Sequence, residues 1–76
     1  MSEVLLEPGT RVFVHHDVLA TNYLSWEDNE GTIIFIVDDL YFVRMSGMFV
    51  ERLTERWRFN VPLKLQVDQF TAVEVL

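Results

Sequence analysis

Short runs of β-branched and aromatic residues, each bounded by Gly, Pro, Asn or Asp, recur through this 76-residue chain. In residues 11–15, Val12 and Val14 alternate with polar and aromatic residues. Successive side chains of a strand point to opposite faces, so this alternation puts the two valines on one face. Helical spacing of apolar residues is scarce elsewhere, whereas period-two runs separated by turn residues indicate strands. The sequence therefore predicts an all-β fold of five or six short antiparallel strands.

The strongest run is residues 32–37, which is apolar on both faces. We expect it to lie at the centre of a sheet or to be covered on both sides. Asp38 and Asp39 are expected to make a tight turn into residues 40–45, the antiparallel neighbour of this run. The other expected strands are residues 11–15, 63–67 and 72–76, and the other expected turns are Pro8-Gly9, Ser46-Gly47 and residues 68–70.

Residues 16–30 are expected to form a long polar loop. Their short polar side chains bond to nearby backbone groups and so compete with the hydrogen bonds of a strand. Tyr23 and Trp26 lie inside this segment, and we expect both to fold back over one end of the core.

Residues 48–59 fit two patterns. Phe49, Leu53 and Trp57 recur every fourth residue, as on a helix, but Leu53, Trp57 and Phe59 also fit a period of two. Like-charged pairs four residues apart in this segment disfavour a helix. We favour a strand, and a short helix near residues 49–58 stays open as the alternative.

Length and composition restrict the class of protein. Half of the residues are apolar, which is too many for a disordered chain, and 76 residues are too few for a second domain, so residues 1–76 are expected to form one domain. The absence of cysteine excludes disulfides, thiol catalysis and cysteine zinc sites. The longest apolar run is residues 33–37, whereas a membrane span needs about 20 residues. The acidic start is unlike a signal peptide, so we expect a cytoplasmic location and no membrane partner.

A resemblance follows from three matching stretches. Residues 8–14, Gly31-Thr32-Ile33-Ile34 and Tyr41-Phe42-Val43-Arg44 resemble the SH3-like barrels of bacteria, which include KOW-type domains and the small variable subunit of ferredoxin-thioredoxin reductase. Residues 60–65 are similar to the last third of that subunit, whereas residues 45–59 have no counterpart in it. The resemblance implies a small SH3-like barrel that binds another molecule.

Residues that could support catalysis do not form a recognisable set. His15 and His16 are adjacent, so on a strand they point to opposite faces and cannot bind one metal ion together. The carboxylate pairs at residues 27–28 and 38–39 are expected in turns open to water, where two pKa values are not driven apart. The sequence has no glycine-rich phosphate loop and no Cys nucleophile. We therefore expect neither an enzyme nor a cofactor or metal site.

An excess of apolar residues points to binding instead. Thirty-eight of the 76 residues are apolar, which we expect to exceed what so small a core can hide, so part of the surface is expected to contact a protein partner or a second copy. Trp, Tyr and Arg are the residues that dominate protein interfaces. The candidate aromatic and arginine face is Tyr41, Arg44, Arg52, Arg56, Trp57, Arg58 and Phe59.

The charge distribution supports one alternative. Residues 1–40 carry a net charge of −7 and residues 41–76 a net charge of +1, within a total of −6 that disfavours nucleic-acid binding. Acidic side chains in loops could instead imitate phosphates and cover the basic surface of a nucleic-acid enzyme, as small phage-encoded inhibitors often do. The candidate acidic face is Glu27, Asp28, Glu30, Asp38 and Asp39.

Overall fold

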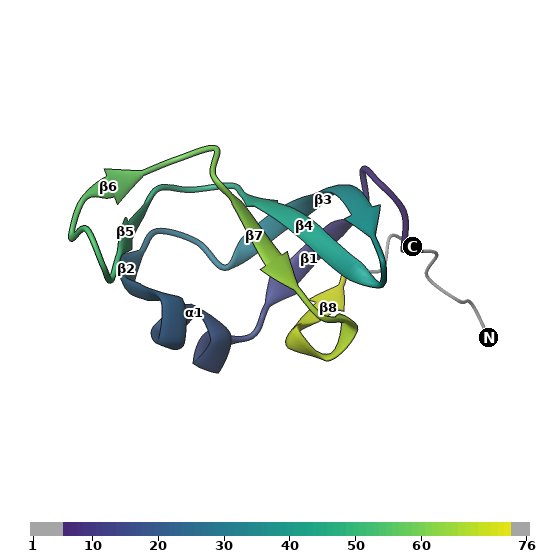
Figure 1. The fold of residues 1–76 in the computed structure, drawn as a ribbon, viewed down its shortest axis with the longest axis horizontal. Helices are drawn as coiled ribbons and strands as arrows, with labels where there is room; N and C mark the ends of the chain where they lie inside the picture. The colour runs from purple at the N-terminus through teal and green to yellow at the C-terminus, as the bar shows by residue number, and fades with distance from the viewer. Residues whose placement is uncertain (1–5, 74–76) are drawn as a thin grey trace.

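The computed structural model describes residues 6–73, which form two antiparallel sheets and one short α-helix (Figure 1). The first sheet has the order β7-β4-β3-β1-β8. Its strands are β1 (Arg11–Val14), β3 (Glu30–Val37), β4 (Leu40–Met45), β7 (Pro62–Leu65) and β8 (Phe70–Ala72). The second sheet has the order β2-β5-β6. Its strands are β2 (Tyr23–Trp26), β5 (Phe49–Glu51) and β6 (Trp57–Arg58). The all-β antiparallel class that the sequence predicts is confirmed.

The strands at the middle of the first sheet agree with the sequence pattern. In β1, Val12 and Val14 are fully buried, whereas Arg11 and Phe13 are exposed, as period-two alternation requires. β3 is the central strand of this sheet. It is not covered on both faces along its length, because the alternate residues Phe35 and Val37 are exposed.

The turn between β3 and β4 has the expected two residues. Asp38 and Asp39 have φ of 49° and 65°, the left-handed values that a two-residue type I′ hairpin turn needs at both positions. Asp tolerates this region better than most residues because its short side chain bonds locally. Val37 and Leu40 are consequently Cα partners across the hairpin.

The segment expected to be a long polar loop is ordered differently. Residues 16–30 contain α1 (His16–Asn22) and β2, so the prediction of a loop over the whole segment is wrong. Two buried side chains, Val18 and Leu19, hold the seven-residue helix to the core. The expectation for the aromatic residues is confirmed: Tyr23 is buried, and Trp26 packs partly buried against the core.

Residues 48–59 contain two short strands, β5 and β6, joined by a turn, so the strand that the sequence favours is present over part of the segment and the helix alternative is wrong. β5 and β6 pair as an antiparallel hairpin in which Phe49 lies opposite Arg58 and Val50 opposite Trp57. The final strand also begins earlier than expected. Residues 67–69 form a 3-10 turn and β8 starts at Phe70, whereas residues 74–76 of the expected last strand lie outside the described residues.

The eight strands outnumber the expected five or six, and the two sheets do not close into a barrel. β6 and β7 are each an edge strand of their own sheet, although only three residues separate them. Asn60 between them has a φ of 59°, and Pro62 has no amide hydrogen to donate. The left-handed backbone at Asn60 breaks the extended conformation between the two strands, and Pro62 begins β7 without an amide hydrogen for a further strand.

Candidate interaction surface

Residues 49–60, the ribbon, comprise β5, a turn and β6, and they lie at one end of the molecule (Figure 1). Phe49 is the only buried residue of the ribbon, at 2% exposed. Its ring stacks on that of Tyr23, with centroids 4.3 Å apart and planes inclined by 26°. Phe49 is therefore the one side chain of this twelve-residue segment that is buried in the core, in addition to the backbone pairing of β5 with β2.

Large apolar side chains of the ribbon face solvent. Leu53 is 97% exposed, Trp57 55% and Phe59 64%. Trp57 is the Cα partner of Val50, the strand neighbour of Phe49, so Trp57 points to the side of the hairpin away from the core. Leu53 was not among the expected binding residues. Leu53 stands between the polar residues Arg52 and Thr54, in the turn that joins β5 to β6, and this polar context is the sequence feature that indicates its exposure.

The three arginines of the ribbon have different tasks. The Arg52 guanidinium donates to the carbonyl oxygens of Ala20 and Tyr23, the latter at 3.1 Å, and so ties the ribbon to the end of α1. Arg58 pairs with Glu51 across the hairpin at 3.1 Å. The side chain of Arg56 makes no hydrogen bond or ion pair with any part of the chain that the structure describes, which leaves its charge available.

The structure does not bring every expected residue to the ribbon. Tyr41 packs edge-on against Phe70 in the first sheet, with ring centroids 5.2 Å apart, and so belongs to the core. Arg44 lies opposite Pro62 and Thr32 on the outer side of that sheet. The expected face is therefore smaller than the sequence indicated. It consists of Leu53, Arg56, Trp57 and Phe59, with Arg52 and Arg58 holding the ribbon in shape.

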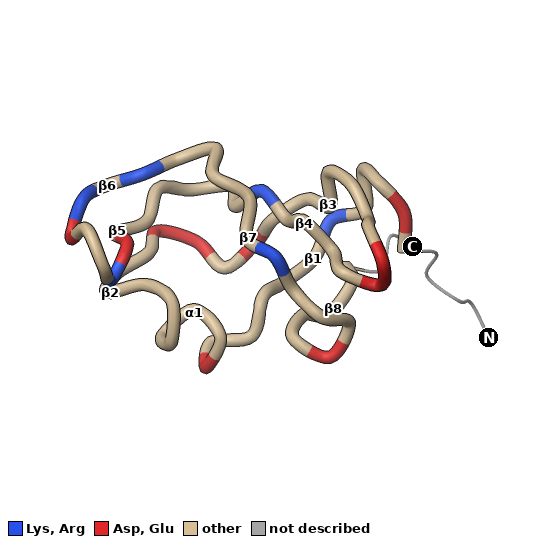
Figure 2. Tube along the Cα trace, in the orientation of Figure 1, with Lys and Arg blue, Asp and Glu red and all other residues tan. Residues whose placement is uncertain are grey.

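The acidic residues do not form one surface. Asp38 and Asp39 lie at the β3–β4 turn, at the end of the molecule away from the ribbon (Figure 2). Glu27 and Asp28 lie between β2 and β3, and Glu30 is the first residue of β3. Glu30 is paired with Arg11. Glu27 and Asp28 each accept a backbone N–H. With Glu30, three of the five acids of the expected acidic face therefore interact within the chain.

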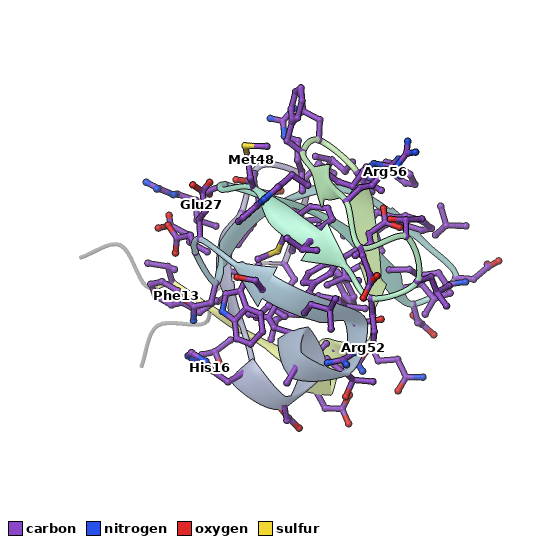
Figure 3. The ribbon with its side chains drawn as sticks, turned by 90° about the vertical axis from the view of Figure 1, so that its left-hand side faces the viewer. Phe13, His16, Glu27, Met48, Arg52 and Arg56 are labelled. Atoms are coloured by element: carbon purple, nitrogen blue, oxygen red, sulfur yellow. The ribbon has the colours of Figure 1, made fainter. Side chains whose placement is uncertain are left out.

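A hollow lies on each side of the ribbon. One, of about 390 Å³, is lined by residues 45–48 together with Glu27, Phe59 and Asn60. Figure 3 shows Glu27 beside Met48, and the Glu27 carboxylate accepts the Met48 N–H at 2.7 Å. Arg56 lies on the opposite side of this view. The second hollow, of about 240 Å³, lies between Phe49 and residues 61–63. Both hollows are large enough to take side chains of another molecule.

Tyr23 lines the second hollow and has a perturbed acidity. Its burial, together with the nearby Glu51 carboxylate, raises the pKa of its hydroxyl to about 12. The ring is 5% exposed, so the charged phenolate would lose most of its hydration. The Tyr23 hydroxyl is therefore protonated at neutral pH, and its ring forms part of the lining of the second hollow.

The two histidines do not converge. His15 Nε2 is 2.9 Å from the hydroxyl of Thr71, whereas the His16 ring lies edge-on to Trp26 at 6.2 Å. Within residues 6–73, no three His, Asp or Glu side chains come close enough to hold a metal ion. In the same residues, no helix has the length and apolar composition to cross a membrane.

Comparison with protein-family models, with curated proteins and with solved structures found no match to this chain. The candidate surface therefore rests on its own geometry: an exposed aromatic hairpin with one free arginine, next to two hollows.

Proposed function

We propose that the protein is a non-enzymatic interaction module that works in the cytoplasm and binds a protein partner through the ribbon. The exposure of Leu53, Trp57 and Phe59 within seven residues carries the proposal. Each of these side chains leaves apolar area in water, at a cost of about 25 cal/mol per Å², which a partner surface would remove. Exposed aromatic residues gathered with arginine are typical of the energetic centre of protein interfaces.

The shape of the ribbon supports a specific contact. A partner can pack on Trp57 and Phe59 while its own side chains enter the hollow between Phe59 and Met48. The contacts of Phe49 and Arg52 with the core hold the hairpin in one arrangement before binding, which reduces the entropy lost on association.

The charge of the ribbon indicates the kind of partner. Residues 49–60 contain three arginines and two glutamates, a net charge of +1 in a chain of net charge −6. The opposite sign of the ribbon orients the molecule toward a partner surface that is apolar at its centre and acidic at its rim. Arg56 is the residue available for such a rim contact.

The test starts from the full chain as bait in an extract of its native host, and the partner captured is then purified. We expect Trp57→Ala to weaken its binding about 30-fold, as for a central interface residue, and Arg56→Ala to weaken it less. Val67→Ala is the matched control, because Val67 is also 55% exposed but lies outside the ribbon. Unchanged affinity in both folded ribbon variants would remove the proposed surface.

Salt distinguishes this function from the inhibitor alternative. Aromatic docking tolerates salt, whereas an acidic surface that imitates phosphates loses affinity steeply as salt rises. Charge reversal at Asp38 and Asp39, the acids of the alternative face at the end of the molecule away from the ribbon, should leave ribbon binding intact. The internal contacts of Glu27, Asp28 and Glu30 favour the ribbon over the acidic face.

A further inference from the structure

The outer side of the first sheet carries a second apolar patch, distinct from the ribbon. Phe35 and Phe42 are Cα partners whose rings stack at 4.3 Å, and Val37 lies opposite Leu40 in the same register. In β4, Leu40 and Phe42 alternate with the buried Val43 and Met45 and so point away from the core. In β3, a register shift between Ile33 and Phe35 turns Phe35 and Val37 to the same outer side. Phe35 is 43% exposed and Val37 49%, so the stack faces solvent.

Charged residues bracket this patch in an ordered way along the strands. Asp38 and Asp39 lie at one end, at the tip of the hairpin. Arg44 lies at the other end, two residues beyond Phe42 and on the same side of the sheet. Lys64 flanks the centre as the Cα partner of Phe42. Among the described residues, neither Arg44 nor Lys64 forms an ion pair within the chain.

We propose that the occupant of this outer sheet face is a second copy of the same chain, packed face to face with its strands running in the opposite direction. A two-fold axis through the Phe35–Phe42 stack places the apolar patches against each other. It also places the acidic turn of each copy near Arg44 of the other, so the face is complementary to itself in charge as well as in apolar character. A face with acidic residues at both ends would repel a second copy, whereas this face brings acidic residues next to Arg44.

The area available sets the strength of the contact. The five strands contain 25 residues, each covering about 3.3 by 4.8 Å, so the face measures roughly 400 Å². Two such faces bury on the order of 800 Å², below the area of a standard interface and in the range of weak, transient dimers. We expect a reversible dimer with a Kd of about 1–100 μM, set by mass action.

The proposed dimer leaves both ribbons free. The β3–β4 turn and the ribbon lie at opposite ends of the molecule, so the antiparallel arrangement puts the two ribbons at opposite ends of the dimer (Figure 1). A partner with two suitable sites would then bind with avidity, although the dimer itself does not depend on the ribbon.

Charge exchange between copies provides the test, measured by sedimentation over micromolar to millimolar concentrations. Arg44→Glu alone and Asp38→Arg/Asp39→Arg together should each weaken self-association at least 10-fold. An equimolar mixture of the two variants should form a mixed dimer about as strong as the wild type. Arg56→Glu and Trp57→Ala, on the ribbon, are the controls and should dimerise normally.

Three results would overturn the inference. The first is a wild-type protein that stays monomeric up to millimolar concentration. The second is a dimer unaffected by Arg44→Glu but lost in Trp57→Ala, which would move the contact to the ribbon. The third is a failure of the charge-exchanged mixture to associate. If a charge variant does not fold, nuclear magnetic resonance of the wild type decides instead: the methyl signals of Val37 and Leu40 should shift with concentration and those of Leu53 should not.

Discussion

Replacement of Phe49 by alanine tests whether one aromatic side chain anchors the ribbon. Phe49 is 2% exposed and stacks on Tyr23, and no other residue of the ribbon is buried. Removal of a buried phenylalanine side chain costs about 3–5 kcal/mol, because the apolar contacts are lost and a cavity remains. A 76-residue domain has a total stability of about 4–11 kcal/mol. Phe49→Ala should therefore remove roughly a quarter or more of the free energy of unfolding.

The loss should be visible in solution. In a domain of this size, a loss of about 3 kcal/mol lowers Tm by roughly 12–24 °C. Urea denaturation followed by circular dichroism gives the free energy of unfolding, and hydrogen exchange reports the Glu55 amide, which donates to the Glu51 carbonyl inside the ribbon at 2.8 Å. We expect both the global stability and the protection of this amide to fall.

Phe59→Ala is the matched control, since Phe59 is in the same segment but 64% exposed and stacks on no other ring among the described residues. Its substitution should change stability by no more than about 0.5 kcal/mol. The reasoning would be refuted if Phe49→Ala lost less than about 1 kcal/mol, below the range for such a buried ring. Unchanged protection of the Glu55 amide would refute it independently.

Three further predictions concern stability. Tyr23 has a pKa near 12 in the folded state against 10.0 in the unfolded state, so the unfolded state loses this proton first as pH rises. The free energy of unfolding should therefore fall by about 3 kcal/mol between pH 10 and 12, with the full contribution present below pH 10. Tyr23→Phe should flatten this part of the pH–stability curve, and an identical slope in the variant would contradict the assignment. Gly31→Ala should lose about 1–3 kcal/mol in thermal denaturation, because its Cβ would lie 2.5 Å from Val43 Cγ1 and 3.0 Å from the Arg44 carbonyl oxygen; no loss would show that the two strands can separate. Asp39→Gly should gain about 0.5–1 kcal/mol in dilute solution, because glycine adopts the φ of 65° without strain, and a measured loss would argue against the type I′ turn.

The strands of the first sheet could be predicted because their pattern is local. β1 and the second half of β4 alternate buried and exposed residues with a period of two that the sequence displays directly. In β3 a register shift between Ile33 and Phe35 breaks this period, and no sequence pattern indicates it. The alternation of side chains along a strand also shows that two residues of the expected binding face cannot lie on the same side of the sheet. Tyr41 and Arg44 are three residues apart in one strand, so they must point to opposite sides of the sheet.

The helix could not be predicted for the opposite reason. α1 has seven residues and only two buried side chains, which is too short for a helical period to show. Its end is stabilised by the guanidinium of Arg52, which bonds to the carbonyl oxygens of Ala20 and Tyr23. A contact between residues about thirty positions apart leaves no local signal, so neither the helix nor the structural task of Arg52 is visible in the sequence.

The residues that stabilise the fold are different from the residues of the two proposed surfaces. The buried residues of the first sheet, with Val18, Leu19 and Tyr23, form one core, and Phe49 is the one residue of the ribbon that is buried in it. The exposed side chains Leu53, Trp57 and Phe59 contribute little to that core, so their substitution should alter binding with little change in the free energy of unfolding. The same holds for Arg44 on the outer sheet face. Because the two proposed surfaces share no residue, loss of partner binding with normal dimerisation, or the reverse, assigns each activity to its own part of the molecule.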